Sequence, residues 1–248
     1  MARVRLTGRV RPEVVLRRRV PRPPSGVVDA LGRLDGLTEL VSDALDDLGI
    51  AGALPASTLW PTMPGARLVG PALTLRNAPL DEPVGDLIAR GHVNRQADYE
   101  AHNLTAPGDV LVIEGHSRAS NIGGMSAALG KRQGGAGAVV WGAIRDVAHS
   151  RAAGYPIWCR ALTPVTGKWR QQTVEINGVV DIGGVCVACG DLVVADESGV
   201  CFVPRAHVRE VVASVRRKAR ADAARRALID RGVPIADFPA PDPAADLE

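Results

Sequence analysis

The chain has 248 residues, of which 46% are hydrophobic and 23% are charged, and its formal net charge is +3. That apolar content is enough to bury one large core, and it excludes a chain that is disordered over most of its length. No apolar run approaches the roughly 18 residues of a membrane-spanning helix, and the N-terminal residues lack the apolar core of a signal peptide. We therefore expect a cytoplasmic globular protein without membrane contact.

The basic residues gather at the start of the chain. Eight arginines lie in the first 22 positions against one acid, Glu13, so this segment carries +7 and the remainder carries −4. A basic arm can bind nucleic acid or another anionic surface. Base stacking, however, needs aromatic side chains, and residues 1–25 contain none. We therefore expect no nucleic-acid contact, but a peripheral arm over residues 1–25, partly a strand at 14–16, that packs on a neighbouring subunit.

Hydrophobic spacing and turn residues predict alternating helices and strands after the arm. In chain order, the predicted elements are a helix at 37–48, a strand at 67–76, a helix at 86–96, a strand at 110–113, a helix at 123–132, a strand at 138–141, a helix at 147–153, a strand at 157–159, short strands within 173–203, and a long helix from 208 to about 230. The order strand, helix, strand indicates an α/β unit. Because the second half is rich in β segments, a mixed-sheet sandwich fits better than a doubly wound sheet. We expect one domain over 26–235 and a flexible, proline-bearing tail over 236–248.

The four cysteines include one Cys-x-x-Cys pair, Cys186 and Cys189. Redox or zinc chemistry would require a helix N-terminus or a second ligand pair, and the sequence offers neither. Strand alternation would also direct the two side chains to opposite faces. We expect buried free thiols in a reducing compartment.

Two glycine clusters could suggest anion binding, but only the second stands in the right order of elements. The cluster at 134–137 follows a predicted helix and begins a strand, whereas a dinucleotide-binding loop follows a strand and begins a helix. The second cluster, Gly123-Gly124-Met125-Ser126, begins a helix, whose free N–H groups can bind a carboxylate. Close helix–sheet packing through small residues is the alternative explanation for Gly123 and Gly124.

Arg145 and Asp146 follow the apolar strand at 138–141 and the residues Gly142-Ala143-Ile144. The end of a strand thereby carries a fixed cation beside a possible metal-binding carboxylate, where an anionic substrate could reach both. Asp146 could also cap the helix that begins at residue 147.

Six sequence segments, in consistent order over about residues 38–232, resemble the RraA-like family. They are VSDALDDLG at 41–49, VGPALT at 69–74, GDVLV at 108–112, GAIRD at 142–146, GYP at 154–156 and GDLVVADESGV at 190–200. This family includes the 4-hydroxy-4-methyl-2-oxoglutarate and 4-carboxy-4-hydroxy-2-oxoadipate aldolases. The resemblance implies a three-layer ββα sandwich of the swivelling-domain type, with flanking N-terminal helices and a long C-terminal helix. It also implies a homotrimer or homohexamer with active sites at subunit interfaces.

The resemblance assigns roles to the candidate site. In the family's aldolases, Mg²⁺ or Mn²⁺ binds a 2-oxo acid, and retro-aldol cleavage or decarboxylation releases a pyruvate enolate. Arg145 matches the arginine that stabilises the enolate, and Asp146 matches the metal-site aspartate. Substrate binding would fall to Arg145 and to the backbone around Gly123, Gly124, Met125 and Ser126, whose amides match those that hold the pyruvate oxygens.

Three positions depart from the family pattern. Gly124 stands where the aldolases carry an acidic metal-site residue. His116 stands where many relatives carry aspartate, and its imidazole is a candidate compensating ligand. Asp222 is the nearest match to an acid that a neighbouring subunit's C-terminal helix would supply.

Three functions are therefore compatible with the sequence. The first is a class II, divalent-metal lyase acting on a small 2-oxo or hydroxy dicarboxylic acid. The second is a related enzyme with altered chemistry on another small acid in the same pocket, where Gly124 makes room for a larger group. The third is a non-catalytic regulator that binds a protein partner, like family members that bind ribonuclease E.

Overall fold

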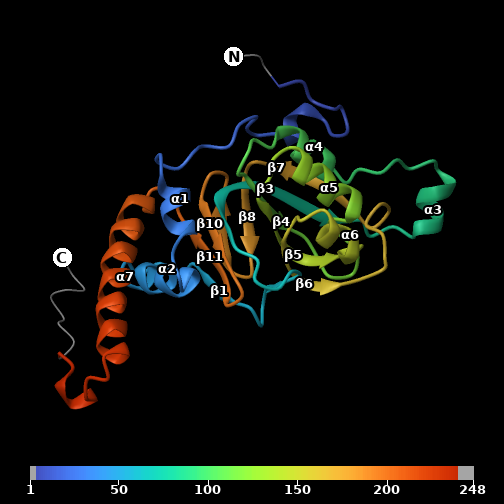
Figure 1. Ribbon diagram of the computed structural model, residues 1–248. Coiled ribbons are helices and arrows are strands. Elements are labelled where there is room, and N and C mark those ends of the chain that lie inside the picture. The colour runs from blue at the N-terminus through green and yellow to red at the C-terminus, as the bar shows by residue number, and fades with distance from the viewer. Residues whose placement is uncertain (1–3, 240–248) are drawn as a thin grey trace.

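The computed structural model of the chain describes residues 4–239 and is organised around one large mixed sheet (Figure 1). Within these residues the sheet has nine strands in the order β1-β11-β10-β3-β4-β5-β6-β2, with β7 paired to β3, and β8 and β9 form a separate hairpin. The strands are β1 Ala53–Pro55, β2 Trp60–Pro61, β3 Leu68–Pro79, β4 Val110–Glu114, β5 Gly137–Ile144, β6 Ile157–Leu162, β7 Gln171–Ile176, β8 Val179–Ile182, β9 Val185–Ala188, β10 Leu192–Ala195 and β11 Gly199–Val203.

The long strand β3 joins the two halves of the sheet. Its first residues pair antiparallel with β10, and its later residues pair parallel with β4. Strands β4, β5 and β6 continue the parallel part. Strands β4 and β5 are almost wholly apolar and buried, as expected of parallel strands that are covered on both faces, whereas β6 is buried only over its first three residues.

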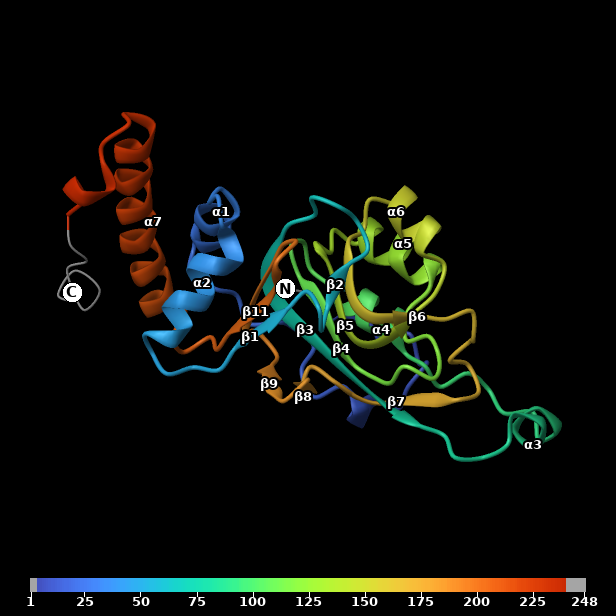
Figure 2. The same ribbon diagram turned by 90° about the horizontal axis from the view of Figure 1, so that it is seen from below.

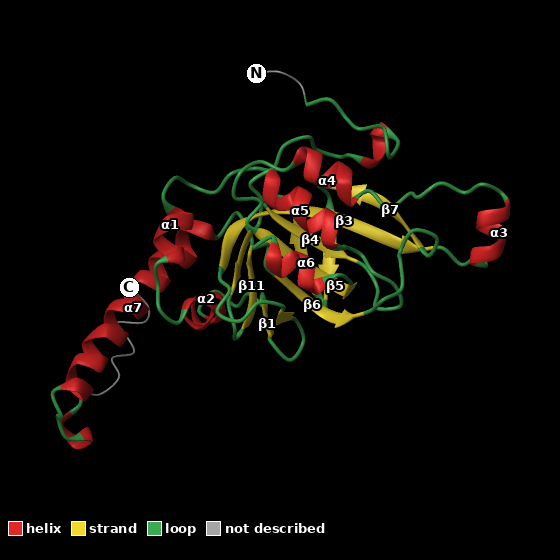
Figure 3. Ribbon diagram, turned by 45° about the vertical axis from the view of Figure 1, so that its right-hand side comes forward, coloured by secondary structure: helices red, strands yellow, loops and turns green. Residues whose placement is uncertain are grey.

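Helices flank the sheet at two places (Figures 2 and 3). They are α1 Val27–Gly32, α2 Leu37–Asp46, α3 Val84–Ala89, α4 Asp98–Leu104, α5 Gly124–Arg132, α6 Val147–Ala152 and α7 Val208–Asp230, with short 3-10 turns η1 Pro12–Val14 and η2 Ile235–Asp237. Helices α4, α5 and α6 lie over the parallel strands, and the β8–β9 hairpin lies on the other face. Helices α1, α2 and α7 gather at the β10–β11 side, whereas α3 projects from the body on a long loop (Figure 1).

Three hydrophobic clusters correspond to these layers. One lies between the parallel strands and α4–α5, a second lies between α1, α2, α7 and strands β10–β11, and a third fills the space between the sheet and the β8–β9 hairpin. Trp158 is fully buried in the third cluster, and its indole N–H donates to the carbonyl of Asp196 at 2.8 Å. The predicted fold class, an α/β sandwich with flanking N-terminal helices and a long C-terminal helix, is confirmed.

The predicted helix at 86–96 is wrong in extent. Helix α3 ends at Ala89, because Gly91 adopts a left-handed conformation (φ 67°) that turns the chain out of the helix. A second helix, α4, follows at Asp98–Leu104 and was not predicted. Most other predicted elements differ from the observed ones by a few residues at their ends, and the C-terminal helix ends at Asp230 as expected.

The predicted arm strand at 14–16 is also wrong. This part of the chain is the turn η1 followed by a single bridge between Val15 and Ile176. The described part of the arm packs on its own chain: Arg18 donates to the carbonyl of Val4 at 2.8 Å, and Arg22 forms an ion pair with the buried Asp109. The described part of the arm thus contacts its own chain, and the expected contact with a neighbouring subunit stays a prediction.

The remaining sequence predictions concern the cysteines, the tail and the membrane. All four cysteines are free, and three are buried as expected, whereas the expectation is wrong for Cys186, which is exposed on β9. Of the predicted flexible tail, residues 240–248 lie outside the described residues, and η2 forms a turn just before them. No helix within 4–239 is long and apolar enough to span a membrane.

Candidate functional site

A cavity of about 400 Å³ lies where β5 ends and α5 begins. Its wall includes all six residues that the sequence singled out at these two ends: Gly123, Gly124, Met125, Ser126, Arg145 and Asp146. The carboxyl end of a parallel strand beside a helix N-terminus is a common location for ligand sites in α/β proteins. The structure therefore brings the predicted arginine, carboxylate and helix start together.

The start of α5 offers unused N–H groups to the cavity. Gly123 occupies the N-cap position in an extended conformation and has no side chain with which to cap the helix. The N–H of Gly124 donates to Asp146 Oδ2 at 3.1 Å. In the described residues the N–H groups of Met125 and Ser126 have no acceptor, so both remain available to an anion in the cavity.

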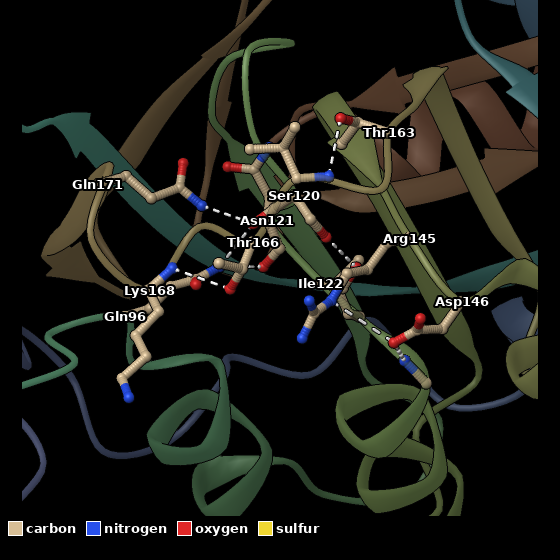
Figure 4. Close-up of polar contacts among 12 residues, drawn as sticks. Gln96, Ser120, Asn121, Ile122, Arg145, Asp146, Thr163, Thr166, Lys168 and Gln171 are labelled. Atoms are coloured by element: carbon tan, nitrogen blue, oxygen red, sulfur yellow. Dashed lines mark hydrogen bonds and ion pairs between the residues drawn. The ribbon is translucent and has the colours of Figure 1, made fainter. Parts of the chain in front are cut away.

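Arg145 and Asp146 adopt a fixed arrangement at the end of β5 (Figure 4). The backbone N–H of Arg145 donates to the carbonyl of Ile122 at 3.2 Å, which ties the strand end to the loop before α5. Arg145 Nε lies 3.5 Å from Asp146 Oδ2, and both side chains are about 40% exposed, at 40% and 42%. The guanidinium is thus partly neutralised by Asp146 and partly open to the cavity.

The backbone of Asp146 is left-handed, with φ 59° and ψ 37°. Such a conformation costs roughly 1 kcal/mol in a residue other than glycine and is several-fold commoner in aspartate and asparagine than in most residues. The turn directs the carboxylate back to α5, where it accepts the Gly124 N–H. Asp146 therefore stands at the N-cap position of α6, as expected, but its side chain makes no capping hydrogen bond.

Gly124 is required by packing. A Cβ atom there would lie 2.6 Å from His149 Cβ and 3.2 Å from Asp146 Cβ, so α6 can approach α5 only because this position lacks a side chain. Close packing therefore explains this glycine, but the partner is α6 rather than the sheet that the sequence had suggested. Because His149 already fills the space, Gly124 does not make room for a larger ligand group.

A polar network that the sequence did not reveal holds the loop before α5 (Figure 4). The amide of the fully buried Asn121 donates to the carbonyls of His116 at 2.9 Å and Ala143 at 3.1 Å. Gln96 and Gln171 both donate to the carbonyl of Ser120, at 3.0 and 2.9 Å. These amides fix the backbone that precedes Gly123, so the helix start is held rigidly against β5.

An acidic residue that the sequence did not reveal, Asp98, also lines the cavity from the first turn of α4. Burial raises the pKa of Asp98 above its ordinary value, against the opposing effects of the Ser126 hydroxyl and the charge of Arg9, which lower it. Ser126 Oγ in turn lies 2.9 Å from Nε2 of the buried His102. The sequence carried no signal for Asp98 because α4 itself was not predicted.

His102 makes a specific contribution to acid sensitivity. It is 1% exposed, and burial lowers its pKa from 6.5 to about 4. The unfolded chain therefore binds the proton more tightly, so stability is complete above pH 6.5 and is lost as the pH falls toward 4. We expect the wild type to lose about 2 kcal/mol of unfolding free energy between pH 7 and pH 5 through this group.

Urea unfolding at several pH values measures this loss, with His102→Gln as the comparison because glutamine keeps a polar atom near Ser126 without titrating. The wild type is expected to have the steeper dependence on pH, and parallel curves for the two proteins would contradict the assignment.

The two further candidates, His116 and Asp222, do not join the site within one chain. The ring of His116 does not line the cavity, and its burial lowers the pKa. Asp222 lies on α7, where its Oδ1 is 3.7 Å from Nη1 of Arg225. Figure 1 shows α7 at the β10–β11 end of the sheet, away from α5 and α6. A contribution of Asp222 from a neighbouring subunit stays a prediction.

The donor set at the cavity suits a magnesium-type ion only in part. In residues 4–239 no cluster of three or more histidine, cysteine, aspartate or glutamate side chains could hold a metal. Asp146 Oδ1, however, accepts no hydrogen bond from these residues, and Mg²⁺ is commonly held by one or two carboxylates with waters and substrate oxygens. The site therefore fits an ion held by Asp146 and completed by water and substrate, and it does not fit a cage made of protein ligands alone.

The fold and the cavity together define an α/β protein with a polar pocket at the carboxyl end of a parallel strand. A model of the RraA-like family (Aldolase/RraA) matches residues 38–202, and the chain therefore belongs to that family. A Halalkalibacterium halodurans protein named "Putative 4-hydroxy-4-methyl-2-oxoglutarate aldolase" is 35% identical over 198 residues, which cover 79% of this chain and 86% of that protein.

Solved structures agree with this assignment. Streptomyces coelicolor RraAS2, described as an unusual member of the RNase ES inhibitor RraA protein family, matches with a TM-score of 0.69 and 31% identity over 83% of this chain and 98% of that one. An uncharacterised Pseudomonas syringae protein matches with a TM-score of 0.72 and 27% identity, over 86% and 96% of the two chains.

Proposed function

We propose that the protein is a lyase that cleaves a small 2-oxo or hydroxy dicarboxylic acid, by retro-aldol cleavage or decarboxylation, and releases pyruvate. The observation that carries this proposal is the convergence of Arg145 and the free N–H groups of Met125 and Ser126 on one cavity. The relatives named as aldolases support a lyase-like enzyme.

The chain's own residues suit the binding of a 2-oxo acid. The N–H groups at the start of α5 bind its carboxylate and keto oxygens. Arg145, fixed through its backbone and flanked by Asp146, lies where negative charge develops on the enolate oxygen when the carbon–carbon bond breaks. A divalent ion held by Asp146 would supply further Lewis-acid stabilisation of that charge.

Asp98 is the proposed proton donor. Bond cleavage leaves the electron pair on the pyruvate enolate, whose C3 must take up a proton. Burial raises the pKa of Asp98, so its acid form persists to a higher pH than in an ordinary aspartate, and Asp98 lines the same cavity as the amides at the start of α5. In retro-aldol cleavage the substrate hydroxyl releases a proton to solvent as the new carbonyl forms, and solvent returns one proton to Asp98, so no net proton is consumed. After decarboxylation, solvent returns the proton to Asp98.

Pyruvate release tests the proposal. Purified protein is incubated with 4-hydroxy-4-methyl-2-oxoglutarate or oxaloacetate, with Mg²⁺, Mn²⁺ or a chelator, and pyruvate is measured by coupled reduction to lactate. We expect turnover that depends on added ion. Absence of pyruvate from both substrates with either metal would exclude the proposed reaction.

A regulatory function is the second candidate, and the similarity to RraAS2 favours it. A regulator would bind a protein partner through its surface, and substitution of Arg145 inside the cavity would leave that binding unchanged.

Assembly as a trimer or hexamer with interface sites is part of the lyase proposal, and light scattering of the purified protein measures it.

A further inference from the structure

The lyase proposal leaves the basic N-terminal arm without a role, yet one of its arginines reaches the candidate site. Arg9 lines the 400 Å³ cavity together with Arg145 and Asp98. It also lines a larger groove of about 830 Å³ between the arm and β7, so it stands at the boundary between the two spaces. A residue distant in sequence from α5 and β5 thus forms part of their cavity.

The arm next to Arg9 is anchored to α4. The N–H of Thr7 donates to Glu100 Oε2 at 2.8 Å, and the Thr7 hydroxyl donates to the same oxygen. Glu100 is fully buried, and Asn103 donates to its other oxygen at 2.9 Å. A buried carboxylate must keep its hydrogen-bond donors, so this contact holds the arm in one place on α4.

The side chain of Arg9 is held in turn by an aromatic ring. Its guanidinium lies 4.7 Å from the ring centroid of Tyr99, which also lines the cavity. A guanidinium stacked on a ring face keeps its N–H edge free for a planar, bidentate partner such as a carboxylate. Within the described residues Arg9 has no salt-bridge partner.

The charges around the cavity are unbalanced. The charged residues in its wall are Arg9, Arg145, Lys168, Asp98 and Asp146. Asp146 is paired with Arg145 at 3.5 Å. Three cations thus face two carboxylates, so the wall carries a net positive charge and has capacity for an anionic group beyond the one at α5.

We propose that Arg9 of the N-terminal arm binds the distal carboxylate of the substrate and thereby selects dicarboxylic over monocarboxylic oxo acids. This inference rests on the proposed function, because it takes the oxo-acid end of the substrate to bind at α5 and Arg145. The arm is then part of the site rather than an attachment to it.

The test compares two arginines of the same arm. Arg9→Ala is expected to raise the KM for the dicarboxylic substrate about 10-fold or more and to leave inhibition by the monocarboxylate pyruvate unchanged. Arg11→Ala is the matched control, since Arg11 is exposed, pairs with Glu13 at 3.4 Å and does not line the cavity. Arg9→Lys, which keeps the charge without the planar fork, should fall between Arg9→Ala and wild type.

Direct binding separates this inference from the lyase proposal. Calorimetry with 2-oxoglutarate and with pyruvate needs no turnover, and we expect Arg9→Ala to weaken only the binding of 2-oxoglutarate. If the wild type releases no pyruvate but this selective loss occurs, the reaction is wrong and the role of Arg9 stands. If Arg9→Ala equals wild type in KM and in 2-oxoglutarate binding, or if the wild type binds neither acid, the role of Arg9 is overturned.

Discussion

Replacing Arg145 with alanine is expected to lower kcat for pyruvate release by at least 100-fold while the protein stays folded. The guanidinium is the permanent cation at the α5 end of the cavity, and the resemblance to the aldolases assigns it to the enolate oxygen. Because that charge appears only as the bond breaks, the loss should fall mainly on kcat, with a smaller effect on KM. Arg145 is 40% exposed, so its truncation leaves no large cavity in the core.

Two further variants make this expectation specific. Arg160→Ala is the control, because Arg160 is also an exposed arginine on a strand, stacked 4.1 Å from the Trp141 ring, and it does not line the cavity. Arg145→Lys should recover only part of the activity, since an ammonium keeps the charge but not the fixed fork of donors. Turnover by Arg145→Ala within a few-fold of wild type would remove the observation on which the lyase proposal depends.

The parts of the site that the sequence predicted are those that short segments determine. The apolar run of β5, which begins at residue 137 and ends at Ile144, directly precedes Arg145, and the glycine pair before Met125 begins α5. Strand length and helix start follow from neighbouring residues, so these ends could be located without tertiary information. The resemblance to the family then assigned the two ends to one binding site.

The parts that the sequence missed depend on partners far along the chain. The arm is placed by Thr7 bonding to Glu100, 93 positions away, and the loop before α5 is held by Gln171, 51 positions from Ser120. Helix α4 has seven residues, too few to form without tertiary packing. Asp98 therefore became visible as a cavity residue only in the folded chain.

Tertiary packing also explains how this cavity differs from the one that the family resemblance implies. The resemblance to the aldolases implies a carboxyl group at the position of Gly124, but His149 occupies the space where such a side chain would begin. The cavity instead has a carboxyl group on α4, in Asp98, and a cation from the arm, in Arg9. Both come from segments outside the strand–helix unit that bears Arg145, so the chemistry of the site is set by how the arm and α4 pack on it.

Asp98→Asn is expected to reduce kcat by about 100-fold and to change its dependence on pH. Burial raises the pKa of Asp98, so the neutral acid persists to a higher pH than an ordinary aspartate would allow. As proton donor it must be neutral, and wild-type kcat should therefore fall as the pH rises through this raised pKa. Asparagine keeps the size of the side chain but has no acidic proton, so the variant should lack that decline.

Three measurements separate proton donation from a merely structural role. Binding of 2-oxoglutarate should be nearly unchanged in Asp98→Asn, and exchange of the pyruvate C3 hydrogens with deuterated water should be lost with kcat. The matched control is Asp86→Asn, an exposed aspartate in the first turn of α3. Since folding raises the pKa of Asp98, the wild type should also lose stability relative to Asp98→Asn as the pH rises through that pKa. If the variant keeps the wild-type decline of kcat at high pH, another group donates the proton and Asp98 only supports Ser126 and the start of α5.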